Sequence, residues 1–209
     1  MSQPATRETG TAAASIPALY ERHASEFARR RAEGPWPDLV WIERFAARLT
    51  GAATILDLGC GMGVPVARTL AARGHAVTGI DTSQRMIDLA RVNVPAAEFE
   101  VGDMRTFVPA CTFGAILAWD SFFHLTHDDQ RAMIPRFALY AAQGAPVLFN
   151  TGPHHGIAMG EFAGEPLFHA SLAPDEYRAL LDTNGFSVHE FAPEDPGAGG
   201  RTVWLAIKR

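Results

Sequence analysis

The stretch TILDLGCGMG, residues 54–63, decides the fold of this chain. Its first half, residues 54–58, is a short apolar run, which is typical of a strand buried on both faces of a parallel sheet. Its second half carries three glycines at alternate positions, and glycine permits the positive φ angles and the close backbone approach that a ligand-binding turn requires. A helix that follows such a turn points its N-terminal amides at the same place, where a carboxylate or phosphate binds favourably. We therefore expect a ligand site at the tip of this strand, the edge at which open α/β sheets bind ligands.

Strands and helices alternate along the rest of the chain. The apolar patterns predict further strands over residues 76–80, 97–101, 113–119, 147–150, 187–191 and 202–207. They predict intervening helices over residues 64–72, 83–92, 128–142 and 175–183. This alternation predicts a Rossmann-like, doubly wound α/β fold: a seven-stranded, mostly parallel sheet with helices on both faces. Only the turn-rich segment PEDPGAGG separates the last two strands, so the C-terminal strand should be antiparallel.

The length of 209 residues suits a single domain, which we expect over residues 15–209. Residues 1–14 are small and polar, and we expect them to be frayed. Two helices are predicted within residues 15–50, with a break at the GPWP sequence of residues 34–37. Residues 151–172 carry glycine, proline and three histidines, and their pattern predicts a loop.

Composition and charge exclude several classes of protein. The formal net charge is −5, whereas a nucleic-acid partner usually requires a basic face, so no nucleic acid is expected. No apolar run approaches 18 residues, so we expect no membrane span. The two cysteines, Cys60 and Cys111, form no disulfide framework, and the first residues lack the apolar core of a signal peptide. These features favour a soluble, cytoplasmic protein.

Acidic residues lie at or near the ends of three successive predicted strands. Asp57 lies in the first strand, one residue before the glycine turn, and Asp81 ends the second strand in HAVTGID. A carboxylate at the latter position can accept hydrogen bonds from both ribose hydroxyls of an adenosine cofactor. Asp103 follows the third strand in VGDMRTF, where it can accept a hydrogen bond from an adenine amine, with Met104 against the ring. Alternatively, Asp81 caps the next helix, in competition with Thr82 and Ser83, and Asp103 is a turn residue.

The glycine spacing separates two cofactor classes. A nicotinamide dinucleotide enzyme requires G-x-G-x-x-G, but this chain has G-x-G-x-G-V, with Val64 in the sixth position. The third glycine is thus one residue early. An NAD-dependent oxidoreductase therefore remains the weaker alternative.

These motifs, together with ILAWDSFFHL at residues 116–125, resemble those of class I S-adenosylmethionine-dependent methyltransferases. The resemblance covers residues 54–150 most strongly and extends to small-molecule members from bacteria. It implies that Gly59 and Gly61 approach the methionine moiety and that Asp57 orders its amino group through water. Asp81 would hold the ribose, and the Asp103 side chain and Met104 amide would bind adenine. The N-terminal helices at residues 15–50 would form a lid.

The resemblance also predicts the remaining cofactor contacts. The Trp119 backbone would face the methionine end, and Tyr20 would close over the cofactor, unless it merely packs in the core. Asp120 would order the amino group or hold a histidine tautomer, unless it caps a helix that starts at Ser121. The complete predicted cofactor site comprises Tyr20, Asp57, Gly59, Cys60, Gly61, Asp81, Thr82, Met86, Asp103, Met104, Trp119 and Asp120.

Histidines are the candidates for the acceptor side of the site. Methyl transfer is a direct displacement at a sulfonium, so the protein must align the acceptor and, where needed, remove its proton. An imidazole suits that task near neutral pH. His124 lies just beyond the fourth strand, and His154 and His155 follow the fifth, so we predict these three as catalytic residues; His169 would cap or line the pocket. Adjacent histidines on an extended loop point apart, so we expect no metal site.

The sequence thus predicts a methyltransferase that acts on a small-molecule acceptor at oxygen, nitrogen or sulfur. It lacks the N/D-P-P-Y/F signature of many enzymes that methylate amino groups of DNA bases or glutamine, and we expect no added recognition domain. A protein that binds S-adenosylmethionine without catalysis is the second alternative. We expect Arg22 and the run at residues 29–31 to form a solvated face.

Overall fold

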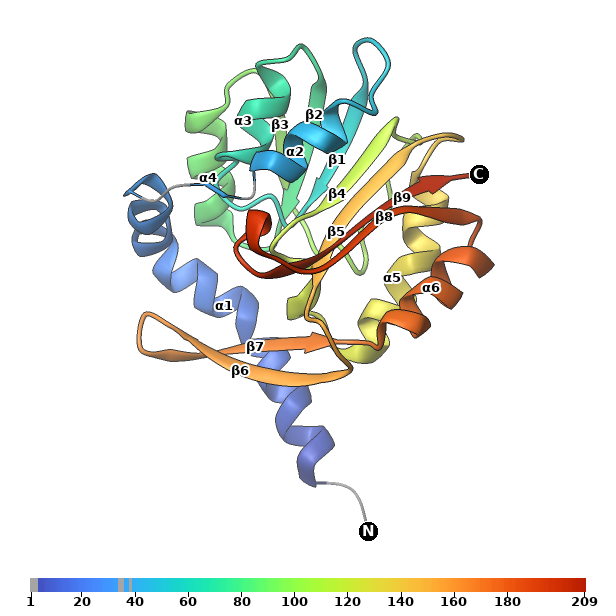
Figure 1. The fold of residues 1–209 in the computed structure, drawn as a ribbon. Coiled ribbons are helices and arrows are strands. Elements are labelled where there is room, and N and C mark those ends of the chain that lie inside the picture. The colour runs from blue at the N-terminus through green and yellow to red at the C-terminus, as the bar shows by residue number, and fades with distance from the viewer. Residues whose placement is uncertain (1–3, 34–35, 38) are drawn as a thin grey trace.

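The computed structural model describes residues 4–33, 36–37 and 39–209. Seven strands form a twisted central sheet in the order β3-β2-β1-β4-β5-β9-β8 (Figure 1). Their bounds are Thr54–Leu58 for β1, Ala76–Asp81 for β2, Glu98–Val101 for β3, Ala115–Ala118 for β4, Pro146–Thr151 for β5, Phe186–Asp195 for β8 and Arg201–Lys208 for β9. Strand β9 runs antiparallel to β5 and β8, and the other neighbouring strands are parallel. The predicted fold is confirmed.

Helices cover both faces of the sheet because the strands bury side chains on both sides. Two groups of helices, one on each face, pack against opposite sides of β1. Ile55 of β1 packs in a core cluster with the first group, and Leu56 and Leu58 pack in a second cluster with the other group. The first group comprises α2 (Leu39–Ala46), α3 (Val66–Ala71) and α4 (Gln84–Asn93). The second group comprises α5 (His127–Tyr140) and α6 (Pro174–Thr183). All these side chains of β1 are fully buried, as expected for the middle of a doubly wound sheet.

The prediction of a loop over residues 151–172 is wrong. Most of this segment forms an antiparallel hairpin of β6 (Gly156–Phe162) and β7 (Glu165–Ser171). Its two-residue turn places Ala163 at φ 54° and Gly164 at φ 80°, which is the geometry of a type I′ turn. Alanine is unusual at a positive φ, so the sequence lacks the Asn-Gly or Asp-Gly signal by which such hairpins are recognised.

The long helix α1 (Pro4–Glu33) lies beside the β6–β7 hairpin and also contacts α4 (Figure 1). Ile16 and Leu19 of α1 pack with Phe162 and Phe168 of the hairpin in a small separate core. The helix bends at His23, whose φ of −108° and ψ of 19° are not helical. It also includes residues 4–14, where we expected a frayed end; alanine is frequent there and favours helix. Residues 1–3, and residues 34 and 35 of the predicted break, lie outside the described residues.

Candidate functional site

A cavity of about 430 Å³ lies between the carboxyl edge of the sheet, α1 and the β6–β7 hairpin. The sheet contributes Asp57 at β1, Asp81 at β2 and Trp119 just after β4, while Tyr20 lines the cavity from α1 and Leu167 from β7. Parallel strands bring their carboxyl ends to one edge, which explains why residues distant in sequence meet here.

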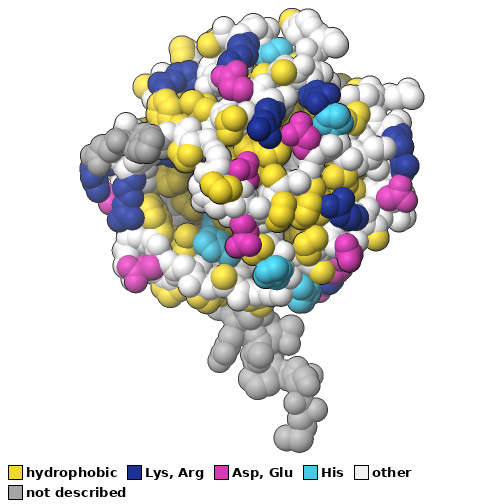
Figure 2. Space-filling model, in the orientation of Figure 1, with side chains coloured by type: hydrophobic (Ala, Val, Ile, Leu, Met, Phe, Trp, Pro, Cys, Tyr) yellow, Lys and Arg dark blue, Asp and Glu magenta, His cyan; other side chains and the backbone are white. Residues whose placement is uncertain are grey.

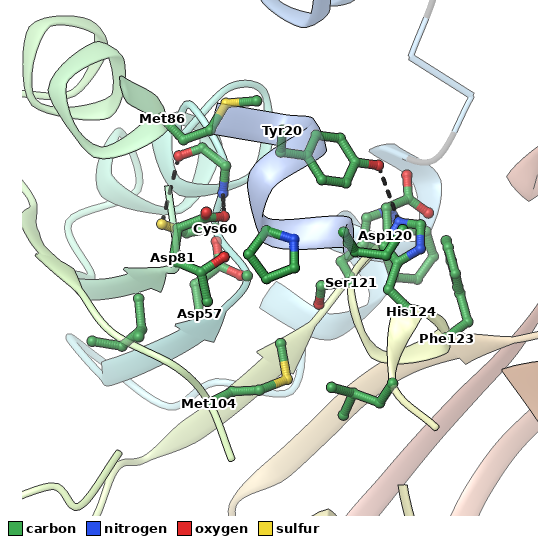
Figure 3. Close-up of a pocket in the computed structure, with 18 of the residues that line it drawn as sticks. Tyr20, Asp57, Cys60, Asp81, Met86, Met104, Asp120, Ser121, Phe123 and His124 are labelled. Carbon is green, nitrogen blue, oxygen red and sulfur yellow. Dashed lines mark hydrogen bonds between the residues drawn. The ribbon is translucent and has the colours of Figure 1, made fainter. Parts of the chain in front are cut away.

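All twelve residues predicted to bind the cofactor line this cavity. In Figure 3, Asp57 and Asp81 lie on one side of it, and Asp120 and His124 lie on the other. Tyr20 projects between the two groups from α1. The cavity therefore has one side at β1 and β2, where most of the predicted cofactor contacts lie, and a second side beyond β4. The individual cofactor contacts stay predictions.

The glycine turn after β1 has the backbone that the sequence predicted. Gly59, Gly61 and Gly63 have φ angles of 78°, 53° and 73°, a region that side chains disfavour. The Gly59 and Cys60 amides donate hydrogen bonds to the carbonyl of Ile80 at 2.7 and 3.0 Å, which fixes the turn against β2. A Cβ atom at Gly59 would lie 2.3 Å from the Cβ of Ser121. Glycine is therefore required at this position by both conformation and space.

Asp57 is a buried carboxylate that receives no hydrogen bond from the described residues. Burial, and to a lesser extent the negative charge of Asp81, raises the pKa of Asp57 to about 7. A buried charge without a partner is costly, so a cationic group in the cavity would be stabilised here. The site thus fits a ligand that carries an ammonium group next to the glycine turn.

Asp81 joins the glycine turn to the start of α4. One of its oxygens accepts a hydrogen bond from the Gly61 amide and the other from the Ser83 amide, both at 2.9 Å. Ser83 itself caps α4 by accepting from the Met86 amide, so the capping role considered for Asp81 belongs to Ser83. Burial raises the pKa of Asp81 despite these amides. A carboxylate oxygen can accept more than one hydrogen bond, so Asp81 can still bind two hydroxyls.

Asp103 lies at the end of the cavity next to Met104 and is held by Arg105. The Arg105 Nη2 atom lies 2.6 Å from Oδ2 of Asp103, and its backbone amide lies 2.9 Å from Oδ1. Arg105 also reaches Asp129 at the start of α5, at 3.3 Å. Burial alone would raise the pKa of Asp103, but the hydrogen bonds from Arg105 lower it. Arg105 therefore orients this carboxylate, which the sequence analysis did not foresee.

On the far side, Tyr20 and His124 form a partly buried hydrogen bond. The Tyr20 hydroxyl lies 3.0 Å from Nε2 of His124, and Nδ1 of His124 lies 2.8 Å from the carbonyl of Phe168 (Figure 3). A carbonyl only accepts, so Nδ1 carries the proton and Nε2 accepts from Tyr20. Burial lowers the pKa of His124 to about 4, which keeps the ring neutral. His124 thus lines the cavity as predicted, but both of its nitrogens are occupied.

His154 and His155, which we predicted as catalytic, do not line this cavity. Both are exposed, and the ring of His155 stacks on that of His127 with 4.5 Å between centroids. They precede the β6–β7 hairpin, which the sequence did not reveal, and the histidine of the hairpin that lines the cavity is His169. The placement of His169 agrees with its predicted role as a lining residue.

Asp120 has a different partner from those we considered. The guanidinium of Arg201 binds both of its carboxylate oxygens, at 2.6 and 2.8 Å, and Asn150 donates to it at 2.7 Å. These bonds outweigh the effect of burial and lower the pKa of Asp120. The short helix η1 (Phe122–His124) has Ser121 at its N-cap position, so Asp120 is not its cap. Arg201 begins the last strand, and no local motif marks it.

Arg31 also lines the cavity, although we expected its run to form a solvated face. Ser121 and Phe123, which the predicted site did not include, line the same side. On the face shown in Figure 2, acidic and basic side chains are interspersed, without a continuous basic stripe.

Four consecutive residues of α1 attach the helix to three other elements. Besides Tyr20, Glu21 accepts hydrogen bonds from the Ser83 hydroxyl at 2.7 Å and the Arg85 amide at 3.1 Å, at the start of α4. The next two residues, Arg22 and His23, both bind Glu165 at the start of β7. Helix α1 is thereby held over both sides of the cavity.

Within the described ranges, no group of three or more histidine, cysteine, aspartate or glutamate residues is arranged to hold a metal ion. None of the helices in the described part of the chain is both long and apolar enough to cross a membrane.

Comparison with known sequences points to one family. A family model described as a methyltransferase domain matches residues 55–144. The chain is 32% identical to trans-aconitate 2-methyltransferase of Variovorax paradoxus over 198 residues, which cover 91% of this chain and 71% of that protein. It is 40% identical to the enzyme of the same name from Delftia acidovorans, over 45% of this chain. In the match to the Delftia enzyme, and in those to two other enzymes of the same name, the chain spans only 32–34% of the length of the matched enzyme.

Solved structures share the fold. A 1,6-didemethyltoxoflavin-N1-methyltransferase from Burkholderia thailandensis, with its substrate and S-adenosylhomocysteine bound, superposes with a TM-score of 0.74 and 16% identity. The match covers 96% of this chain and 90% of that one. An amino pentose methyltransferase from Micromonospora echinaspora with bound S-adenosylmethionine gives a TM-score of 0.69 and 20% identity, covering 88% and 96%. At such identities the likeness concerns the fold alone.

Proposed function

This chain belongs to the class I S-adenosylmethionine-dependent methyltransferase family, and from that premise we propose that it methylates a small molecule by direct displacement. Bound S-adenosylmethionine supplies a methyl group activated by its sulfonium. Family membership overturns the alternative of an NAD-dependent oxidoreductase. The experiment below also tests the other alternative, a protein that binds S-adenosylmethionine without catalysis.

The observation that carries the proposal is the Asp57 carboxylate. It is buried, lacks a hydrogen-bond donor among the described residues and lies beside a glycine turn that leaves room for a ligand. The amino group of S-adenosylmethionine is a cation that would stabilise this charge, directly or through water. We assign the ribose hydroxyls to Asp81, and adenine to the Asp103 side chain and Met104 amide.

The enclosure of the cavity supports a small acceptor. Helix α1 and the hairpin both line it, and its volume of about 430 Å³ must hold the cofactor and the acceptor together. We propose that α1 serves as the lid and that Tyr20 closes the cavity when a ligand is bound. Because several relatives are named for trans-aconitate, that compound is the first acceptor to test.

Calorimetry and a turnover assay test the proposal. Pure protein should bind S-adenosylhomocysteine, and Asp57→Asn and Asp81→Ala should each weaken this binding at least tenfold. With S-adenosylmethionine and a panel of small acceptors, S-adenosylhomocysteine should accumulate. A folded protein that binds neither compound would refute the proposal. Binding without turnover over a broad panel of acceptors would favour the alternative that the protein binds S-adenosylmethionine without catalysis.

A further inference from the structure

His169, on β7, is a histidine of the cavity wall. Among the described residues, no group forms a hydrogen bond with either ring nitrogen. His124, in the same wall, differs in this respect, because Tyr20 and the Phe168 carbonyl occupy both of its nitrogens. A lone pair that can take a proton from a ligand is therefore available at His169 and not at His124.

Neighbouring rings hold the His169 imidazole in place. It stacks on His124 with 5.0 Å between centroids and 26° between planes. The ring of Phe123 contacts it edge-on at 4.9 Å. On the β6 side, a Cβ atom at Gly160 would lie 3.4 Å from Cε1 of His169, so the glycine lets the ring lie close to that strand. A ring fixed in this way is preorganised for contact with a ligand.

The groups around His169 favour its neutral form at pH 7. Partial burial lowers its pKa, and the negative charge of Asp120 opposes this effect in part. Among the described residues, the titratable or charged groups that line this side of the cavity are Tyr20 and Arg31 from α1, His124 from η1, and Asp120 with its partner Arg201 from the sheet edge. His124 is neutral, and Arg201 balances Asp120. His169 is thus deprotonated at neutral pH, while Asp120 lies close enough to stabilise an imidazolium.

We propose that His169 is the general base of the reaction and that the acceptor carries an O–H or N–H group. This inference rests on the function proposed above. The acceptor oxygen or nitrogen forms a bond to the methyl carbon, and its proton passes to the imidazole nitrogen. The carbon–sulfur bond breaks and its electron pair stays on sulfur, which becomes a neutral thioether. His169 then releases the proton to solvent when the cavity opens.

With His169 as the base, the class of acceptor is an alcohol, a phenol or an amine. A carboxylic acid has a pKa near 4 and has already lost its proton at pH 7, so its methylation requires no base. Phe123 and Leu167 line the same side and would contact an apolar part of the acceptor.

The test compares His169→Gln with His155→Gln, the same change at an exposed histidine outside the cavity. The acceptors are catechol, benzyl alcohol and tyramine, with trans-aconitate as the acceptor that has no proton to lose. His169→Gln should lower kcat for a protic acceptor about 100-fold or more, the range of general-base catalysis, and leave the affinity for S-adenosylhomocysteine unchanged. In the wild type kcat should fall at acidic pH as His169 is protonated, and the variant should lose this dependence. His155→Gln should behave as the wild type.

A second readout does not depend on turnover. In NMR spectra of the protein with bound S-adenosylhomocysteine, the His169 ring should be neutral at pH 7, and its signals should shift when a protic acceptor is added. Turnover of trans-aconitate alone, an unchanged pH profile in His169→Gln, or a His169 ring that no protic acceptor perturbs would each overturn the inference. Failure to bind S-adenosylhomocysteine would instead refute the proposed function.

Discussion

The Tyr20 hydroxyl donates a hydrogen bond to Nε2 of His124 across 3.0 Å, and this bond joins α1 to the wall of the cavity beyond β4. His124 is buried and Tyr20 is partly buried, and this burial raises the pKa of Tyr20, so the phenol keeps its proton. This pair shows that α1 is part of the site, because His124 depends on it for one of its two hydrogen bonds. The sequence analysis considered Tyr20 and His124 for separate roles.

We predict that Tyr20→Phe lowers the free energy of unfolding by about 1–3 kcal/mol, because it leaves Nε2 of His124 buried without a donor. Urea denaturation of Tyr20→Phe, His124→Phe and the double variant measures this effect. The loss of unfolding free energy in the double variant should be smaller than the sum of the losses in the two single variants, by about 0.5–3 kcal/mol. Strict additivity would show that the bond contributes nothing to stability.

We predict that Gly59→Ala is much more harmful than Gly144→Ala. The two glycines have the same φ of 78°, so an alanine at either position costs about 1 kcal/mol or somewhat more in backbone strain. Nothing lies within 4 Å of a Cβ atom at Gly144, whereas at Gly59 the Cβ atom would overlap Ser121. Gly59→Ala should therefore show the larger drop in Tm and should also lose S-adenosylhomocysteine binding in calorimetry. Equal drops in Tm with binding intact would mean that the turn accommodates a side chain.

We predict that Arg105→Ala weakens S-adenosylhomocysteine binding about tenfold by freeing the Asp103 carboxylate, since a mobile group must be ordered again on binding. Arg131→Ala is the matched control, because Arg131 also bridges two acidic residues, Asp128 and Glu176, but lies outside the cavity lining. Calorimetry should show unchanged affinity for the control. If both variants bind as the wild type does, Arg105 does not position Asp103 for the ligand.

The cofactor side of the site could be predicted from the sequence because its residues lie in local motifs at strand ends. Residues 54–58 form β1 as predicted, and a parallel sheet necessarily brings Asp57 and Asp81 to one edge.

The acceptor side could not be predicted to the same degree, because it depends on tertiary contacts between distant segments. Arg201 reaches Asp120 from the far end of the chain, and a hairpin whose turn has alanine at a positive φ brings His169 to the cavity. Neither contact has a spacing or composition signal in the sequence. The sequence favoured His154 and His155 as catalytic residues because they follow β5, whereas the pairing of β6 with β7 is what places His169 at the cavity.

The raised pKa of Asp57 predicts that ligand affinity and protein stability depend on pH in opposite directions. In the folded protein without ligand, Asp57 is protonated below pH 7, whereas in the unfolded chain it is ionised above about pH 4. Between these values the folded state holds the extra proton, so through this group the free energy of unfolding decreases as pH rises from about 4 to 7. A ligand ammonium requires the ionised carboxylate, so affinity should be full above pH 7 and fall up to about tenfold per pH unit below it.

Calorimetric Kd values for S-adenosylhomocysteine at several pH values from 5.5 to 8 measure this dependence. The groups that interact with Asp57 are Asp81, whose pKa burial also raises, and Cys60, whose thiol stays neutral because burial raises its pKa. Asp57→Asn should therefore bind S-adenosylhomocysteine more weakly, and its affinity should depend less steeply on pH. The pH dependence that remains in this variant would be due to Asp81. In the same variant without ligand, Tm should vary less between pH 5 and 7 than in the wild type. If wild-type affinity does not change between pH 5.5 and 8, the ligand does not depend on an ionised Asp57, and the ammonium group lies elsewhere.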